Sequence, residues 1–300
     1  MGLQSFFTFS VLWLLPSLPM SGDSEIKVIK DLEFATVGSH SYSLKMDLYL
    51  PIKPEGSALV VWIHGGGWRK GSKEKCQINW LPKYGYSLAS ISYRLSNLDK
   101  FPAQLHDCKG AVRWLRANAK KFGYDPNKIV AAGTSAGGHL SALMATSHGV
   151  SGLEGKTGGN LAYSSKVLGA VDYYGATDLI LRSKNQPSRT NLVGSVVYDL
   201  LGGGADEKPE LAKLASSAHH ISKDDAPMLV FHGTEDSTVF LDQSKALVQA
   251  YQKAGLSIQF IEVAGAGHGG KIFFDGQNRM SLLHFLKQLT SRRSEFGKLP

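Results

Sequence analysis

The 300-residue chain is predicted to form a single α/β domain, in which helices cover both faces of a mostly parallel sheet. Short apolar runs typical of buried strands alternate along the chain with longer segments of helical periodicity. Four of the apolar runs lead directly into glycine-rich loops that carry polar side chains. Because ligands bind at the carboxyl ends of parallel strands, the functional residues are expected in these four loops.

The first elements are predicted from alternating and continuous apolar patterns. Residues 26–34 and 41–50 alternate apolar and polar side chains on either side of a turn, which predicts an antiparallel pair at the sheet edge. The continuous apolar runs 58–63 and 87–93 predict buried strands. A periodic segment that opens on proline, residues 102–121, is predicted to be a helix, because proline is well tolerated in a first helical turn.

The second half of the domain continues the alternation, with one weaker region. Residues 176–223 include a glycine triplet and a Ser/Asn-rich part, and they are predicted to form short helices that border a cleft. The remaining elements are expected in this order: strand 128–132, helix 138–146, strand 167–174, strand 228–231, helix 241–254, strand 257–263 and helix 272–289. This alternation predicts mostly parallel neighbours in the sheet.

The composition is that of an ordinary globular protein with a basic surface. Apolar residues make up 43% and charged residues 19% of the chain, so a core can form without a disulfide scaffold. The net charge is +8, but the lysines and arginines are scattered, and no nucleic-acid-binding signature accompanies them. A solvated basic surface without a nucleic-acid partner is therefore expected, while weak attraction to acidic polymers is left open.

The first 22 residues differ from the rest of the chain. Residues 6–18 are apolar, small residues follow, and no acidic or basic side chain precedes Asp23. This pattern predicts a signal peptide at 1–22 and a secreted or periplasmic protein. The apolar run is too short to predict stable membrane insertion, although an uncleaved anchor or a lipid-facing helix is left open. At the other end, the polar residues 291–300 are predicted to form a flexible tail.

The two cysteines, Cys76 and Cys108, do not decide whether a disulfide forms. An exported protein could join them, but Cys108 shares a helical face with apolar neighbours and suits a core position. The chain has no C-x-x-C spacing, and the pair His219–His220 lacks a third ligand at helical spacing. No metal site is therefore predicted.

The pentapeptide Gly133-Thr134-Ser135-Ala136-Gly137 lies between an apolar run and a predicted helix. A Gly-x-Ser-x-Gly in this position is typical of the nucleophile elbow of α/β hydrolases. The serine of such an elbow occupies a strained turn that lifts its hydroxyl clear of the sheet, and only small neighbours fit around it. Ser135 is therefore the predicted nucleophile.

A serine nucleophile needs a base to take its proton and a carboxylate to orient that base. His268 lies in a glycine-flanked loop after the last predicted strand, and it is the expected base. The acid is expected between the serine and the histidine, which is the order found in α/β hydrolases. Asp236 is favoured because it stands five residues after the strand-ending Phe231; Glu235 is its main alternative.

The oxyanion of an ester hydrolase is stabilised by backbone N–H groups. The glycine run 65–67 would let bare amides approach a ligand and supply such donors. The N–H of Ala136, at the positive end of the helix after the elbow, would complete the oxyanion hole.

Six short motifs together resemble one family of hydrolases. They are HGGGW at 64–68, SYRL at 92–95, FPAQ at 101–104, GTSAGGH at 133–139, YGATDL at 174–179 and HGTED at 232–236. The chain resembles the hormone-sensitive-lipase-like esterases and the bifunctional acetylxylan/feruloyl esterase (BD-FAE-like) type over nearly its whole mature length. The resemblance implies an α/β-hydrolase fold with a small cap region. One departure is the pair Val239-Phe240, where many relatives have Val-Pro after the acid.

The same resemblance implies roles for the candidate residues. Ser135 would be the nucleophile, Asp236 the acid and His268 the base, and the oxyanion hole would be formed by Gly66, Gly67 and Ala136. Trp68 and Tyr93 are aromatic residues near the cleft; either they contact substrate or they pack in the core.

The expected function is that of a serine carboxylic ester hydrolase, with residues 23–290 as its catalytic domain. It would use no cofactor and act on short-chain acyl esters, of small molecules or linked to polysaccharide, such as acetyl or feruloyl esters of plant polysaccharide. Alternatives are an arylformamidase or peptidase on the same fold, or a non-catalytic binding protein. The sequence does not indicate an oligomeric state.

Overall fold

The computed structural model describes residues 26–39 and 41–291. The predicted signal peptide at 1–22 and residues 292–300 of the predicted tail lie outside the described residues. Within the described part, no helix combines the length and the apolar character needed to cross a bilayer.

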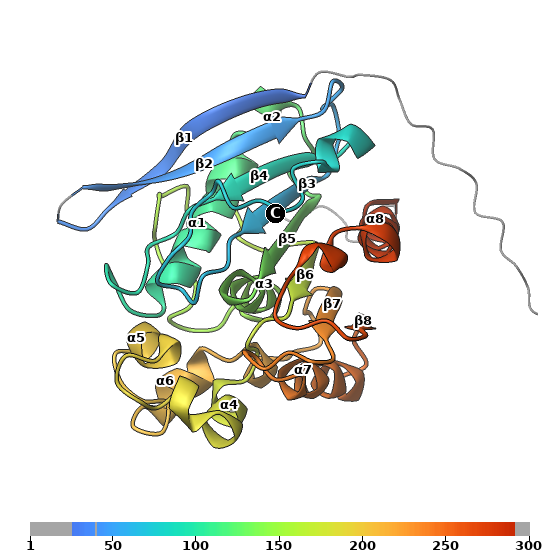
Figure 1. Cartoon of the computed structure of the whole chain (residues 1–300). Coiled ribbons are helices and arrows are strands. Elements are labelled where there is room, and N and C mark those ends of the chain that lie inside the picture. Colours follow the sequence, from blue (N-terminus) through green and yellow to red (C-terminus); the bar gives the residue numbers. More distant parts are fainter. Residues whose placement is uncertain (1–25, 40, 292–300) are drawn as a thin grey trace, which may run out of the picture.

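Eight strands form one sheet in the described residues (Figure 1). Their order across the sheet is β1-β2-β4-β3-β5-β6-β7-β8. Their bounds are β1 Lys27–Val37, β2 Tyr42–Leu50, β3 Leu59–Ile63, β4 Ser87–Ile91, β5 Ile129–Thr134, β6 Gly169–Tyr173, β7 Met228–Gly233 and β8 Ile258–Val263. Every pair from β4 to β8 is parallel, whereas β1 and β2 pair antiparallel with each other and β2 pairs antiparallel with β4. The predicted antiparallel edge and parallel centre are both confirmed.

The helices follow the predicted alternation. The α-helices are α1 Ala103–Ala117, α2 Ala119–Phe122, α3 Ala136–Thr146, α4 Leu179–Asn185, α5 Val196–Leu201, α6 Pro209–Leu214, α7 Asp242–Lys253 and α8 Gly276–Ser291. Short 3-10 helices are η1 Leu81–Tyr84, η2 Pro187–Arg189, η3 Ser217–His219 and η4 Lys271–Phe273.

Two predicted helices are each divided. The segment 102–121 breaks at Asn118, whose side-chain amide donates to the carbonyl of Trp114 and so competes with the helical bonds. The segment 272–289 breaks before Gly276, where the backbone has φ 53° and cannot continue a right-handed helix.

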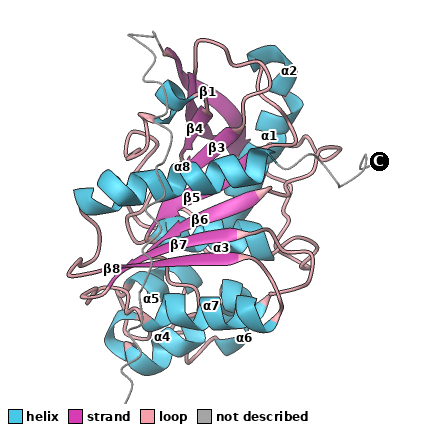
Figure 2. Ribbon diagram, turned by 90° about the vertical axis from the view of Figure 1, so that its right-hand side faces the viewer, coloured by secondary structure: helices cyan, strands magenta, loops and turns pink. Residues whose placement is uncertain are grey.

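Both faces of the sheet are covered, as its apolar central strands require. Every residue of β3, β5, β6 and β7 is buried. One apolar cluster joins the sheet to α1, α3 and α7, and a second joins its other face to η1 and α8. Figure 2 shows α8 lying across the strands. This doubly covered sheet with an antiparallel edge is the predicted α/β-hydrolase fold.

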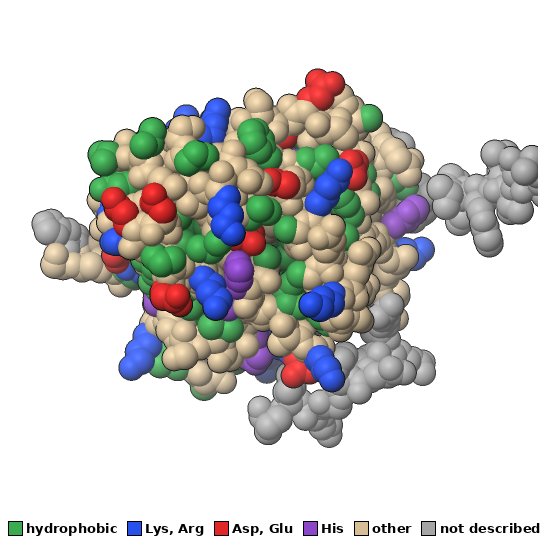
Figure 3. All heavy atoms as spheres, turned by 90° about the horizontal axis from the view of Figure 1, so that it is seen from below, with side chains coloured by type: hydrophobic (Ala, Val, Ile, Leu, Met, Phe, Trp, Pro, Cys, Tyr) green, Lys and Arg blue, Asp and Glu red, His purple; other side chains and the backbone are tan. Residues whose placement is uncertain are grey.

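The weaker region between β6 and β7 forms the short helices α4, α5 and α6, as predicted (Figure 1). It borders the loop that follows β3, because the guanidinium of Arg69 donates to Asp199 at 2.8 Å and to the carbonyl of Gly194 at 2.9 Å. Figure 3 views the molecule from below, where basic, acidic and apolar side chains are interspersed on the surface.

Both cysteines are free, which answers the question that the sequence left open. Cys108 is buried in α1, as its helical face predicts, and Cys76 is half-buried on the other face of the sheet. Burial raises the pKa of the Cys76 thiol to about 12, so this thiol is not a reactive thiolate near neutral pH.

Candidate active site

Ser135 occupies the sharp turn between β5 and α3. Its backbone has φ 52° and ψ −115°, a conformation that costs a non-glycine residue about 1–3 kcal/mol. Two hydrogen bonds hold the turn: the N–H of Ser135 donates to the carbonyl of Tyr173 at 2.8 Å, and the N–H of His139 donates to the carbonyl of Ser135 at 2.9 Å. The strain is therefore balanced by the neighbouring strand and by the first turn of α3.

The glycines of the elbow are dictated by close packing. A Cβ on Gly133 would lie 2.5 Å from the carbonyl oxygen of Ile63, and one on Gly137 would overlap that same carbonyl group. A Cβ on Gly138 would overlap the carboxylate of Asp172. Real Cβ atoms do not approach backbone this closely, so the elbow accepts only glycine at these positions.

The predicted nucleophile, base and acid form one hydrogen-bonded chain. The Nδ1–H of His268 donates to Oδ2 of Asp236 at 2.6 Å, and the hydroxyl of Ser135 donates to Nε2 of His268 at 2.8 Å. An ionised carboxylate can only accept, so the proton of the imidazole lies on Nδ1 and Nε2 is free to accept from the serine. Glu235, the alternative acid, is exposed.

Asp236 is held as a carboxylate by its surroundings. Its side chain is fully buried, and burial alone would raise its pKa. Hydrogen bonds from His232 and His268 outweigh this effect of burial, and the N–H groups of Thr238 and Val239 also donate to Oδ1. The pKa of Asp236 therefore lies well below its usual range. The group therefore stays ionised at neutral pH and can stabilise an imidazolium beside it.

The predicted oxyanion donors lie in the loop after β3 and at the start of α3. Gly66 and Gly67 have φ of 115° and 60°, and a Cβ on Gly66 would overlap the carbonyl of Lys70. Within the described part of the chain, the N–H groups of Gly66 and Gly67 donate to no protein acceptor. Ala136 is the first residue of α3, and its N–H has no acceptor within the helix. All three amides are thus available to a ligand.

Trp68 and Tyr93 are both buried, with 2% and 1% of their surface exposed. The indole N–H of Trp68 donates to Nδ1 of His139 at 3.2 Å, and the Tyr93 hydroxyl donates to the carbonyl of His64 at 3.0 Å. The Tyr93 ring also stacks on the His64 imidazole, with ring centroids 4.3 Å apart. This placement favours the packing interpretation of both residues over substrate contact.

Three histidines of the motif loops support those loops by hydrogen bonds. His64 bonds to the carbonyl of Gly65, and His139 joins Trp68 to the carbonyl of Ala215. Burial lowers the pKa of His64 and of His139 to about 4, so both are neutral near pH 7. His232 accepts from Ser244 and donates to the carbonyl of Val239.

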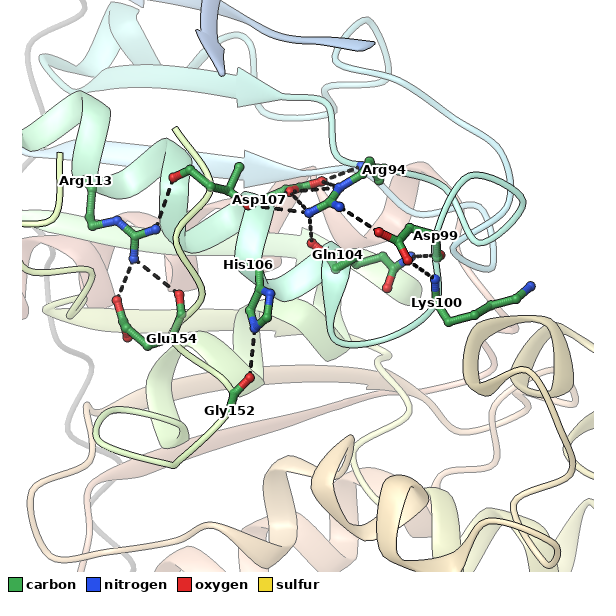
Figure 4. Close-up of polar contacts among 11 residues, drawn as sticks. Arg94, Asp99, Lys100, Gln104, His106, Asp107, Arg113, Gly152 and Glu154 are labelled. Atoms are coloured by element: carbon green, nitrogen blue, oxygen red, sulfur yellow. Dashed lines mark hydrogen bonds and ion pairs between the residues drawn. The ribbon is translucent and has the colours of Figure 1, made fainter. Parts of the chain in front are cut away.

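The SYRL and FPAQ motifs stabilise the scaffold behind the site (Figure 4). Arg94 makes a two-pronged ion pair with the buried Asp107 of α1, with its closest contact at 2.6 Å, and a further pair with Asp99 at 2.7 Å. The side-chain amide of Gln104 donates to the carbonyl of Asp99 at 2.8 Å. The two-pronged geometry and the additional hydrogen bonds offset the large desolvation penalty of burying these charges.

The sequence predicted no contact with the triad for two residues that make one. Tyr174 follows β6 with φ 49°, and its ring lies edge-on to His268 with centroids 4.9 Å apart. Nε2 of His232 lies 3.3 Å from Oδ2 of Asp236. Their position in the sequence could have identified both as site residues, because each stands at or beside the carboxyl end of a central strand.

The histidine pair has ordinary protein partners. His219 lies 3.2 Å from Asp178, and His220 donates to the carbonyl of Leu214. Asp178 caps α4 by accepting from the N–H groups of Ile180 and Leu181. Across residues 26–39 and 41–291, no group of three or more His, Cys, Asp or Glu side chains has the arrangement to hold a metal ion.

The chain matches the model of one protein family and is similar in sequence to several esterases. The BD-FAE family matches residues 46–251. Esterase LipC of Mycobacterium tuberculosis is 30% identical over 259 residues, which cover 83% of this chain and 62% of LipC. Esterase LipQ of the same organism is 27% identical, with 78% of this chain and 56% of LipQ covered. This chain thus spans less than two thirds of the length of these two relatives.

Solved structures of esterases are also similar to this chain. A truncated carbohydrate esterase from gut microbiota superposes with a TM-score of 0.80 at 30% identity, covering 91% of this chain and 99% of that one. The native form of esterase Est2 from the Planctomycetes species Thermogutta terrifontis superposes with a TM-score of 0.68 at 26% identity, covering 92% and 96%.

Proposed function

The chain belongs to the BD-FAE family, and from this premise we propose that it is a serine carboxylic ester hydrolase acting on short-chain acyl esters. The observation that carries the proposal is the hydrogen-bonded chain from Asp236 through His268 to Ser135, with distances of 2.6 and 2.8 Å. Its serine stands on a strained elbow, and three nearby amides have no acceptor among the described residues, which supports a role in acyl transfer.

The proposed reaction has two halves. In the first, Nε2 of His268 takes the proton of Ser135 as Oγ attacks the ester carbonyl carbon, and the carbonyl oxygen becomes an oxyanion near the amides of Gly66, Gly67 and Ala136. His268 then gives its proton to the departing alcohol, which leaves an acyl-serine. In the second half, His268 deprotonates a water molecule as it attacks the acyl carbon, and then returns this proton to Oγ of Ser135 as the acid leaves.

The proposed substrates are acetyl or feruloyl esters of plant polysaccharide. Support comes from the gut carbohydrate esterase and from a bifunctional GH43-CE protein of Bacteroides eggerthii, of which this chain covers 38% at 30% identity and a TM-score of 0.78. We also propose export, on the basis of the apolar segment within residues 1–22, because a polysaccharide substrate lies outside the cell.

The test is hydrolysis of p-nitrophenyl esters of increasing acyl length, with acetylated xylan and methyl ferulate assayed in parallel. Wild type is expected to prefer short acyl groups, and Ser135→Ala is expected to lose roughly 10⁴-fold or more in kcat. Ser141→Ala is the matched control, because it removes a buried hydroxyl that donates to the carbonyl of Gly137 in the same helix. Its kcat is expected to stay within about threefold of wild type, since a neutral hydrogen bond contributes about 1 kcal/mol.

Two outcomes would overturn the proposal. One is a wild type that is inactive on every ester; the other is a Ser135→Ala variant that keeps full activity. Equal losses in Ser135→Ala and Ser141→Ala would show that disturbance of α3, rather than loss of a nucleophile, explains the effect.

A further inference from the structure

A pocket of about 480 Å³ lies beside the triad, and the proposed mechanism does not use it. Three separate parts of the chain line it. Gln77 and Trp80 come from the segment after β3, Tyr174 follows β6, and the remaining wall runs from Gly270 to the start of α8. A volume of this size accepts a group of one or two rings.

The pocket lies on the histidine side of the site. Its wall residue Tyr174 packs edge-on against His268, with ring centroids 4.9 Å apart, and the lining residues Gly270 and Lys271 follow His268 closely in the chain. The amides that would receive the oxyanion belong to the loop after β3 and to α3. Because His268 must reach the oxygen of the departing alcohol, a group held in this pocket belongs to the alcohol part of the ester.

The lining combines ring surfaces with paired charges. Trp80 is half-buried, and the Arg279 guanidinium lies over its ring at 4.5 Å. Arg279 pairs with Asp275 at 2.6 Å, and Lys271 lies 3.4 Å from the same carboxylate. Gln77 adds an exposed amide. Two cations share one carboxylate, so the wall offers many hydrogen-bonding groups and keeps a small positive net charge.

The chemistry of this lining selects among possible occupants. An alkyl chain would remove these polar groups from water without replacing their hydrogen bonds, at a cost of about 1–3 kcal/mol for each group. A sugar ring offers apolar C–H groups for the aromatic walls and hydroxyls for the amide, the guanidinium and the carboxylate.

We propose that this pocket is a saccharide subsite that holds the sugar on the alcohol side of the ester bond. The inference rests on the proposed function for its connection to catalysis, and it deepens that function by naming how the polysaccharide is bound. The subsite would make the protein selective for the alcohol part of the ester, independently of its choice of acyl group.

The test compares two acetyl esters that differ only in the alcohol: acetylated xylo-oligosaccharide and ethyl acetate, whose alcohol is too small to fill the pocket. Trp80→Leu removes one ring surface of the pocket, and Gln77→Ala removes one amide. Trp80→Leu is expected to lower kcat/KM for the sugar ester about tenfold, which corresponds to about 1.4 kcal/mol, mainly through KM. Gln77→Ala is expected to lower it about threefold to fivefold, as loss of one hydrogen bond does. Neither variant should change kcat/KM for ethyl acetate more than about twofold.

Tyr84→Leu is the matched control. Tyr84 packs edge-on against Trp80, with centroids 5.5 Å apart, is 41% exposed, and does not line the pocket. It therefore reports any general disturbance of this aromatic cluster. The proposal fails if Tyr84→Leu impairs the sugar ester as much as Trp80→Leu does, or if Trp80→Leu impairs both esters equally.

A binding measurement separates this proposal from the esterase proposal. Xylotriose, which carries no ester, is titrated into wild type and Trp80→Leu and followed by saturation-transfer NMR. Binding to wild type that weakens in Trp80→Leu supports the subsite even if no ester is hydrolysed, in which case only the proposed function falls. Absence of xylotriose binding to wild type, or equal binding to both proteins, overturns the subsite.

Discussion

Two glycine-rich loops meet at the site and use glycine for different physical reasons. In the elbow loop, residues 133–138, a Cβ on Gly133, Gly137 or Gly138 would collide with backbone or with a buried carboxylate. In the histidine loop, residues 265–270, a Cβ on Gly265 or Gly270 would meet no atom within 4 Å. Those two glycines instead have φ of 68° and 112°, which side chains rarely adopt.

The difference indicates how each loop is held. The elbow loop is positioned by close packing against β3 and β6, so its geometry follows from the core. Apart from the close approach of Gly233 to the carbonyls of Ala266 and Gly267, the histidine loop is positioned by a few hydrogen bonds. They run from the Gly265 N–H to Thr234, from the Glu235 N–H to the carbonyl of Ala266, and from His268 to Asp236. The nucleophile is therefore expected to be rigid, while the base depends on the contacts that orient it.

The largest expected effect comes from breaking the strongest of those contacts. Asp236→Asn removes the acceptor that fixes the Nδ1–H tautomer of His268, so kcat is expected to fall about 10⁴-fold. Hydrogen exchange should become faster at residues 265–270 and stay unchanged at residues 133–138. Faster exchange in both loops would contradict the view that they are held independently.

Gly137→Ala tests the packing of the elbow loop. On helix propensity alone, alanine in α3 should stabilise the protein by about 1 kcal/mol. Because its Cβ would overlap the carbonyl of Ile63, we expect instead a loss of about 3 kcal/mol in the free energy of unfolding, measured by urea denaturation. A gain in stability would show that propensity, and not close packing, decides this position.

The buried carboxyl beneath the elbow predicts a pH dependence. Burial raises the pKa of Asp172 to about 7, against about 4 in an unfolded chain. Between these values the folded protein keeps a proton that the unfolded chain releases, so stability falls as pH rises from 4 to 7. Asp172→Asn lacks this titration and keeps an oxygen for the N–H of Gly175. The stability of wild type relative to the variant should therefore fall by at most about 1.4 kcal/mol per pH unit.

Unfolding curves at pH 4.5, 6 and 7.5 measure this difference. A constant difference between the two proteins across the range would contradict a raised pKa for Asp172. An increase with pH would mean that the carboxylate is stabilised in the folded state, contrary to its burial with no partner for Oδ2 in the described part of the chain.

The smallest effects test the histidine loop itself. Gly269→Ala forces a side chain into φ 104°, which is expected to cost about 1–2 kcal/mol in the free energy of unfolding. Gly267→Ala is the matched control: its φ is not positive, and its nearest neighbour is 4.0 Å away. We expect Gly267→Ala to change stability by less than about 0.5 kcal/mol. Equal costs would contradict the view that the positive φ of Gly269 limits this loop.

The sequence by itself determined the fold class, the order of the elements and the loops that carry the candidate site. These features follow from local patterns: the apolar runs of the central strands, the helical periodicities and the glycines after each strand. The elbow at Ser135 is the clearest case, because its strained turn lies between adjacent segments and needs small residues within five positions.

Tertiary structure decided what depends on distant parts of the chain. The choice between Asp236 and Glu235 was made by contact with a histidine 32 positions away, and the serine meets that histidine across 133 positions. The burial of Trp68 and Tyr93 and the pocket lined by Trp80 and Tyr174 depend likewise on which strand ends the sheet order places side by side. Local patterns carry no information about such pairings, because those contacts form only when the sheet is complete.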